Sequence, residues 1–206
     1  MIGSAEVAIG IPGLSLAPGD HICAFYQGTT VHNEILAPFI RSAVDAHDKC
    51  ICIVGRKTEA MLRDALAGTV DLDACVASGQ LELLPIEQSY LRGGSFTANE
   101  MLEFWDTRVG GALASGHYGF ARALGEATWA VQDPRFAEEF VVYEAELNRF
   151  LPQYPQVVMC LYAIDRLRGD LLCGILKTHP KLLLGSMIVE NPYYMDPTEF
   201  LASRRR

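Results

Sequence analysis

The sequence contains no long hydrophobic run, and none of its apolar stretches approaches the roughly 18 residues needed to cross a bilayer. The first 17 residues are mildly apolar, but no basic residue precedes their apolar part, and Glu6 lies among them. They therefore do not match a secretory signal peptide. We expect a cytoplasmic protein that does not associate with a membrane.

The usual motifs of metal and nucleophile sites are also missing. No C-x-x-C or H-x-x-x-H pair occurs, so the spacing of structural zinc sites is absent. No G-x-S-x-G elbow occurs, and the apolar neighbours of Cys23, Cys160 and Cys173 predict thiols that are poor nucleophiles. We predict no cofactor and no metal, although a site assembled from distant residues such as His21, Cys160 and His179 stays open.

The composition is that of one ordered domain. The chain has 206 residues, of which 50% are hydrophobic and 20% are charged. This length suits one large α/β domain with a sizeable core, and the composition argues against disorder. The six cysteines are scattered and lie mostly in apolar runs, which is typical of reduced, buried thiols.

The charge is strongly acidic for a chain of this size. The net charge is −8, and three of the 17 basic residues are the closing arginines 204–206. The rest of the chain is therefore more acidic still, and such a surface repels nucleic acid. We expect no direct DNA binding. The arginine tail is expected to be a solvated end, with contact to an acidic partner as the alternative.

The apolar pattern predicts an α/β fold with a mainly parallel central sheet and helices on both faces. Nearly continuous apolar runs are typical of buried parallel strands, and amphipathic helical segments separate them. The predicted strands are 21–26, 50–55, 81–84, 118–124, 157–162 and 183–189. The predicted helices include one around 35–44 with Pro38 in its first turn, one opened by the capping box of Thr97 and Glu100 that runs to about Leu113, and two at 134–151 and 169–177.

Ligands of open α/β sheets bind beyond the carboxyl ends of the strands, so the residues that follow each strand are the candidates for a site. Glu126 follows a strand directly, where an ATPase of this class would hold its metal-directing carboxylate. The alternative is a carboxylate stabilised by about 0.3–1 kcal/mol at a helix N-terminus. Trp129 is either core packing or a pocket wall. The other candidates are Tyr26, Tyr90, Tyr162 and Asp165.

The histidines are weaker candidates. His21 opens the first strand and His179 precedes the last, so both lie at the end of the sheet opposite to the expected crevice. A hydrogen-bonded structural role is the preferred interpretation of each. We expect His32, His47 and His117 on the surface.

The first strand-to-helix turn lacks a phosphate-binding loop. The stretch 25–34 has one glycine, Gly28, and no lysine, so it does not match G-x-x-x-x-G-K-[ST]. The dinucleotide-binding pattern G-x-G-x-x-G is absent as well. We therefore predict that the chain does not hydrolyse ATP by the usual machinery.

Nine segments follow one another along nearly the whole chain: 19–26, 48–50, 79–83, 90–96, Gly125 and Glu126 with Trp129, Tyr143 and Glu144 with Asn148, 160–162 with Asp165, 178–180, and 190–192. Together they resemble the MEDS family, the methanogen/methylotroph DcmR-type sensory domain. The resemblance implies a RecA/KaiC-like core without its nucleotide loop. It also implies a sensor of simple hydrocarbon derivatives in prokaryotic signalling and transcription control.

The resemblance divides the chain into an N-terminal extension (1–17), a sensory domain (18–202) and a basic tail (203–206). Family members often adjoin a helix-turn-helix, histidine kinase or anti-sigma domain. Because neither end of this sequence supplies such a segment, we expect it to act through a kinase, an anti-sigma factor or a transcription factor, or by forming a homodimer.

The leading hypothesis is a sensor without enzymatic activity. A small organic ligand would bind at the strand-end residues and bias a movable loop at 87–96, with His21 and His179 as further contacts suggested by the resemblance. Two alternatives stay open: a ligand-free docking scaffold, and a residual nucleotide hydrolase or metal-assisted hydrolase that uses Glu126, Asp165 and the histidines.

Overall fold

The computed structural model describes residues 6–204 and is built on a seven-stranded sheet. Across the sheet, the strands are β5 (Leu81–Leu84), β4 (Lys49–Ile53), β6 (Ala121–Glu126), β7 (Gln156–Ala163), β3 (His21–Tyr26), β8 (Lys181–Leu184) and β9 (Met187–Glu190). Neighbouring strands are parallel except for β8 and β9. The predicted α/β class and mainly parallel sheet are confirmed.

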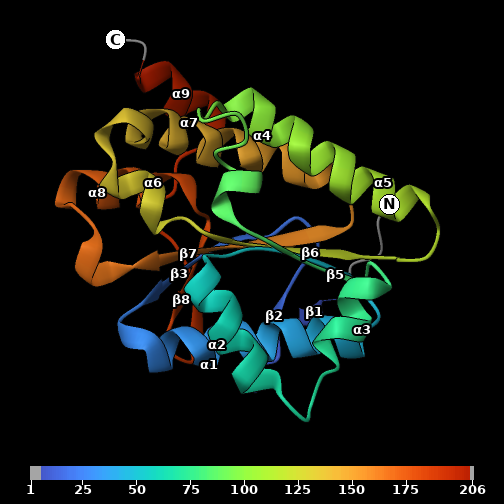
Figure 1. The fold of residues 1–206 in the computed structure, drawn as a ribbon. Coiled ribbons are helices and arrows are strands. Elements are labelled where there is room, and N and C mark those ends of the chain that lie inside the picture. The colour runs from blue at the N-terminus through green and yellow to red at the C-terminus, as the bar shows by residue number, and fades with distance from the viewer. Residues whose placement is uncertain (1–5, 205–206) are drawn as a thin grey trace.

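Helices cover both faces of the sheet, as Figure 1 shows. One face carries α1 (Gly28–Asp45), α2 (Arg56–Leu66), α3 (Leu72–Ala77) and the small hairpin of β1 (Val7–Ala8) and β2 (Ser15–Leu16). The other carries α4 (Ala98–Trp105), α5 (Gly111–Ala114), α6 (Thr128–Gln132), α7 (Pro134–Phe150), α8 (Gly169–Thr178) and α9 (Pro197–Ser203). The two main hydrophobic clusters lie between the sheet and these two layers.

Three of the four predicted helices, which correspond to α4, α7 and α8, begin where the sequence signals place them. Thr97 caps α4 by accepting a hydrogen bond from the backbone N–H of Glu100, as the capping box predicts. The helical segment continues through a π-turn over Asp106–Gly110 into α5, and this irregular turn was not predicted. The predicted helices at 134–151 and 169–177 correspond to α7 and α8.

The prediction of one strand over 183–189 is wrong, because this segment folds back on itself as the hairpin of β8 and β9. Gly185 at the turn has a φ of +61°, a conformation that glycine adopts without steric cost. A Gly-Ser pair between two apolar runs is itself a hairpin signal, and the continuous hydrophobicity around it masked that signal.

Pro38 also departs from its predicted place, since α1 begins at Gly28 and Pro38 lies well inside it. The N-terminal hairpin packs onto this part of α1. A Cβ on Gly10 would lie 2.0 Å from the carbonyl oxygen of Pro38, so only glycine permits this approach. Ile9 and Leu16 are fully buried there. Ile9 and Leu16, within the predicted extension, thus share the core of the domain, and the boundary at 18 stays a prediction.

Five of the six cysteines are buried free thiols, while Cys173 is exposed rather than enclosed by apolar neighbours as expected. It lies on α8, whose buried residues are Leu171, Ile175 and Thr178, and position 173 falls on the opposite side of the helix. Among the residues described, no helix has both the length and the apolar character needed to traverse a membrane.

Candidate functional site

A crevice with a cavity volume of about 330 Å³ opens at the carboxyl ends of β3, β6 and β7. Four of the predicted site residues line it: Tyr26, Glu126, Trp129 and Asp165. The N-terminus of α1 and the first turn of α2 also contribute to its wall. The position matches the general rule for open α/β sheets, because the strand ends and the helix N-termini meet there.

Glu126 is held at the crevice by two hydrogen bonds from α2 and its N-cap. Its Oε2 accepts a hydrogen bond of 2.6 Å from the backbone N–H of Gly55, and its Oε1 accepts one of 2.7 Å from the hydroxyl of Thr58. Gly55 is the N-cap residue of α2, so the carboxylate lies at the positive end of that helix dipole. The helix that stabilises Glu126 is therefore α2, which is distant in sequence, and not the helix that follows it.

His32 is a crevice residue that the sequence analysis placed wrongly on the surface. It is only 4% exposed, its ring stacks on Tyr26 with centroids 4.5 Å apart, and its Nε2 lies 2.8 Å from Oε1 of Glu126. Residue 32 extends the buried stripe of α1 that includes Leu36 and Phe39 by one turn. That i, i+4, i+7 spacing was the signal that could have identified it.

Trp129 joins the crevice to an aromatic cluster behind it. Its ring packs against Tyr90 and Phe96, with centroid separations of 5.3 and 5.9 Å, and also against Phe136 and Phe140. The buried indole Nε1 has no hydrogen-bond partner among residues 6–204. An unpartnered buried donor costs about 1–3 kcal/mol, so this group favours an acceptor that the chain itself does not provide.

Tyr90 does not line the crevice, although the sequence analysis placed it there. Its ring is 3% exposed and packs within the aromatic cluster, between Trp129 and Tyr143. Burial, together with the nearby Cys160 and Glu144, raises the pKa of its phenol well above the usual value. Tyr90 therefore supports the crevice from behind, through Trp129.

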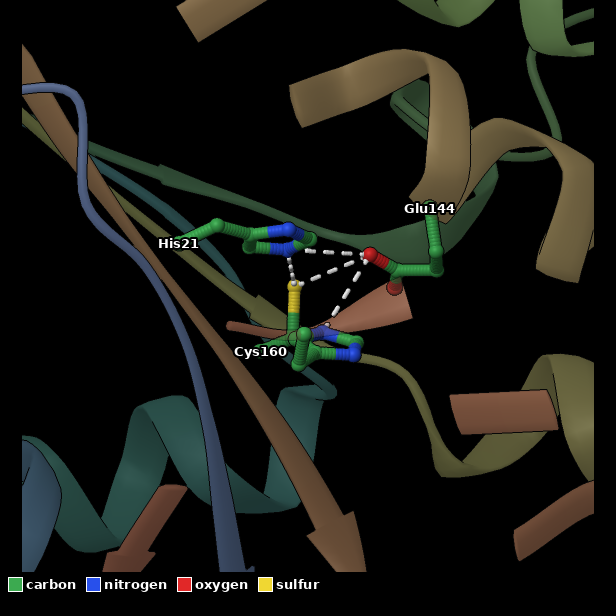
Figure 2. Close-up of side chains that lie close together, drawn as sticks. His21, Glu144 and Cys160 are labelled. Carbon is green, nitrogen blue, oxygen red and sulfur yellow. Dashed lines mark hydrogen bonds and ion pairs between the residues drawn. The ribbon is translucent and has the colours of Figure 1, made fainter. Parts of the chain in front are cut away.

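The three remaining predicted residues, Tyr162, His21 and His179, lie in a second, fully buried site on the α7–α8 face of the sheet. They surround Glu144 of α7, a residue that the sequence analysis noted only as part of the family resemblance. The Tyr162 hydroxyl donates a hydrogen bond of 2.7 Å to Oε1 of Glu144. Figure 2 shows that His21, Glu144 and Cys160 point toward one another.

Burial governs the electrostatics of this second site. Desolvation by burial lowers the pKa of His179 to about 3, which keeps its imidazole neutral. Burial and the Glu144 carboxylate raise the pKa of the Cys160 thiol. Burial alone would raise the pKa of Glu144, but His179, His21 and the Tyr162 hydroxyl outweigh it and lower that pKa. Glu144 is therefore a buried carboxylate that accepts hydrogen bonds from Tyr162 and Cys160 and lies against the Nε2 atoms of two histidines.

Comparison with known proteins gives one family and a set of related folds. The model of the family described as MEDS, the methanogen/methylotroph DcmR sensory domain, matches residues 20–180. The transcriptional repressor DcmR of Methylorubrum extorquens is 24% identical over 171 residues, which cover 82% of this chain and 61% of the repressor. The chain thus spans less than two thirds of the length of that relative.

Solved structures with similar folds are of the RecA/KaiC-like type. They include the flagellar accessory protein FlaH from Methanocaldococcus jannaschii (TM-score 0.55, 10% identity, 94% of this chain and 92% of that chain). The KaiC-like protein PH0186 from Pyrococcus horikoshii has a TM-score of 0.59 and 12% identity, with 87% of this chain and 80% of that chain covered. PH0321 from the same organism, in complex with an unknown peptide, has a TM-score of 0.63 and 9% identity, with 80% of this chain and 76% of that chain covered. At these identities the similarity concerns the fold alone.

Proposed function

The chain belongs to the MEDS family of sensory domains, and we propose that it binds a small organic molecule in the strand-end crevice and signals this binding to a partner protein. The family and the regulator homologue support a sensory and regulatory role. The ligand and the partner are the parts that we infer. A simple hydrocarbon derivative is the ligand class that the family suggests.

The observation that carries the proposal is the open crevice at the strand ends, whose wall includes Tyr26, Glu126 and Trp129. A docking scaffold that had lost its ligand would be expected to close this space with side chains, whereas the crevice retains about 330 Å³. That volume is at the lower end of the range for small-molecule sites. The indole N–H of Trp129 is buried and unpartnered within the described part of the chain, so a shift of this ring on binding would let an oxygen atom of the ligand accept its hydrogen bond.

The surroundings favour a small polar molecule over a nucleotide. The first turn of α1 provides Gly28 and Thr29 to the crevice but no lysine for a phosphate chain. Lys57 and Arg166 on the rim are balanced by Glu126 and Asp165. The crevice therefore has no excess of positive charge of the kind that triphosphate binding requires.

The aromatic cluster provides a route from the crevice to the surface. Trp129 packs on Tyr90 and Phe96, and these two buried side chains anchor the ends of a segment whose residues 92–95 are exposed. Gly93 and Gly94 within it have φ values of +89° and +83°. A ligand that shifts the ring of Trp129 would displace both anchors, and the segment 92–95 would present a changed surface to the partner.

The two tryptophans make a direct test possible. The Trp105→Phe variant leaves Trp129 as the single tryptophan, and the Trp129→Phe variant leaves Trp105, which is 2% exposed in α4. We expect short-chain alcohols or carboxylic acids to change the fluorescence of the Trp105→Phe variant in a saturable way and to leave that of the Trp129→Phe variant unchanged. Native mass spectrometry of the purified chain would identify any ligand that co-purifies.

Two outcomes would contradict the proposal. Equal responses from both variants would place binding outside the crevice. If neither probes nor a co-purified molecule bind, and the segment 92–95 still contacts a partner, the docking scaffold would become the better interpretation.

A further inference from the structure

We propose that His21, Glu144, Cys160 and His179 form a tetrahedral binding site for one divalent transition metal ion of the zinc type. Each residue offers one ligand atom, and all four atoms lie within 4.8 Å of one another. The four side chains are at most 1% exposed. Three of them converge in Figure 2. The site is separate from the crevice and does not depend on the proposed ligand.

Four of the six distances between the ligand atoms fit the edges of a zinc tetrahedron, and the two from Nε2 of His179 to His21 and to Cys160 are at most 4.8 Å. Oε2 of Glu144 lies 3.1 Å from Nε2 of His21, 3.5 Å from Nε2 of His179 and 3.5 Å from Sγ of Cys160. Nε2 of His21 lies 3.4 Å from the same sulfur. Zinc–nitrogen and zinc–oxygen bonds of about 2.0–2.1 Å and zinc–sulfur bonds of about 2.3 Å give edges of roughly 3.3–3.6 Å. The four printed distances already agree with these edges to within about 0.2 Å, so binding would mainly adjust the position of the His179 ring.

Both imidazoles are oriented as metal-bound histidines are. Nδ1 of His179 donates to the backbone carbonyl of Ile175 at 2.8 Å, and Nδ1 of His21 donates to Oδ1 of Asn148 at 3.2 Å. The amide nitrogen of Asn148 donates to the carbonyl of Thr178, which fixes its Oδ1 as the acceptor. With Nδ1 as the outward donor, each ring turns its Nε2 into the cluster, and such hydrogen bonds are typical of the outer shell of metal sites.

Without an ion, these Nε2 atoms face a carboxylate oxygen, which is also an acceptor. Nε2 of His179 has no hydrogen-bond partner among the residues that the structure describes. One added proton would satisfy either the contact of His21 Nε2 or that of His179 Nε2 with Oε2 of Glu144, but not both. One metal ion bound at the centre would satisfy all four ligand atoms together, so it accounts for the arrangement better than an ion pair does.

The charge of the complete site also suits the apolar interior. A divalent ion with the carboxylate of Glu144 and the thiolate of Cys160 has a net charge of zero, which removes most of the cost of burying an ion. The thiol proton is released to solvent when the metal binds. Since four protein ligands leave no open coordination position, the metal would be structural. It would cross-link β3 and β7 to α7 and to the end of α8.

The first experiment uses the full chain. Protein expressed with added zinc and purified without chelator is expected to contain about one zinc per chain by elemental analysis and native mass spectrometry, as a closed structural site requires. X-ray absorption of this sample should give one sulfur and three nitrogen or oxygen neighbours. Cobalt(II) loaded into chelator-treated protein should show the spectrum of tetrahedral cobalt with a thiolate charge-transfer band.

Cys23 provides the matched control. It is a fully buried thiol on the neighbouring strand, directly paired with Cys160 in the β3–β7 register, but it is not one of the four ligands. We expect Cys160→Ser to abolish the charge-transfer band and Cys23→Ser to retain it. Tyr162→Phe, which removes the hydrogen bond to Glu144, should weaken metal affinity by about 10–100-fold while keeping the band.

Three results would overturn the proposal: a chain that takes up neither zinc nor cobalt, a metal shell without sulfur, or a charge-transfer band that survives in Cys160→Ser. Because X-ray absorption is measured on the wild-type chain, the test holds even if a ligand variant fails to fold.

Discussion

Substitution of Gly125 by alanine tests the packing that joins β6 to the aromatic cluster. A Cβ at Gly125 would lie 2.1 Å from the hydroxyl oxygen of Tyr90 and 3.3 Å from its Cζ. Tyr90 cannot easily retreat, because its ring is 3% exposed and is held by Trp129, Phe140 and Tyr143. The added methyl group must therefore displace a tightly packed side chain.

The expected loss of stability follows from two opposing effects. Forcing one extra carbon into a packed core costs about 1–3 kcal/mol. Gly125 lies in a strand without a positive φ, so alanine also restricts the unfolded chain and returns about 0.4–1 kcal/mol. We expect a net loss of about 1–2 kcal/mol in the free energy of unfolding, measured from urea titrations followed by circular dichroism.

The Tyr90→Phe background separates this contact from other effects. Removing the hydroxyl abolishes the 2.1 Å clash, so Gly125→Ala should then cost close to nothing, and the double-mutant cycle should give a coupling of about 1–2 kcal/mol. Gly111→Ala is the control, because Gly111 lies in α5 with open space around its Cβ position. It should be neutral or stabilising. The reasoning would be refuted by a Gly125→Ala variant as stable as the wild type. It would also be refuted if the stability losses of Gly125→Ala and Tyr90→Phe were additive in the double variant.

Three further measurements follow from the buried polar groups. Asp48→Ala should lower the free energy of unfolding by about 3–5 kcal/mol in urea titrations, because it leaves the buried guanidinium of Arg122 without its charge partner. Adding Arg122→Met should recover much of that loss. A double variant no more stable than Asp48→Ala would contradict this. Glu126→Ala should cost about 1.5–3 kcal/mol even without ligand, since it leaves the N–H of Gly55 unpaired, and an unchanged urea midpoint would show that this contact is weak. Removing metal with a chelator should lower the melting temperature of the wild type, by the equivalent of about 4 kcal/mol if zinc had been present at 1,000 times its Kd, and should leave Cys160→Ser unaffected.

The sequence predicts the fold well because buried parallel strands have continuous apolar runs in the sequence. Five of the six predicted strands match strands of the structure. It also predicts that residues following strands lie at one edge of the sheet, which brings Tyr26, Glu126, Trp129 and Asp165 to the crevice. The rule fails for Tyr162, because residues two apart on a strand share a face and Tyr162 therefore points with Cys160 toward α7.

The second site could not be predicted from spacing alone. Its ligand atoms come from β3, β7, α7 and the residue after α8, and only the three-dimensional packing of α7 on the sheet brings Glu144 to the histidines. The sequence left open a site of His21, Cys160 and His179 but contained no local pattern that would add a carboxylate. Tyr90 was misplaced for a similar reason, since the turns after β5 bring it over the face of the sheet, against Gly125 of β6.

The contacts of Glu126 favour the sensor over the hydrolase. Oε2 accepts from the N–H of Gly55, and Oε1 accepts from Thr58 and lies 2.8 Å from His32, so a metal or water would compete with groups that already hold the carboxylate. These contacts fix the first turn of α2 and the start of α1 around the crevice. We therefore expect Mg²⁺–ATP neither to be hydrolysed nor to change the fluorescence of Trp129 in the Trp105→Phe variant. Measurable turnover that disappears in Glu126→Gln would instead mean that Glu126 exchanges its protein contacts for a catalytic role.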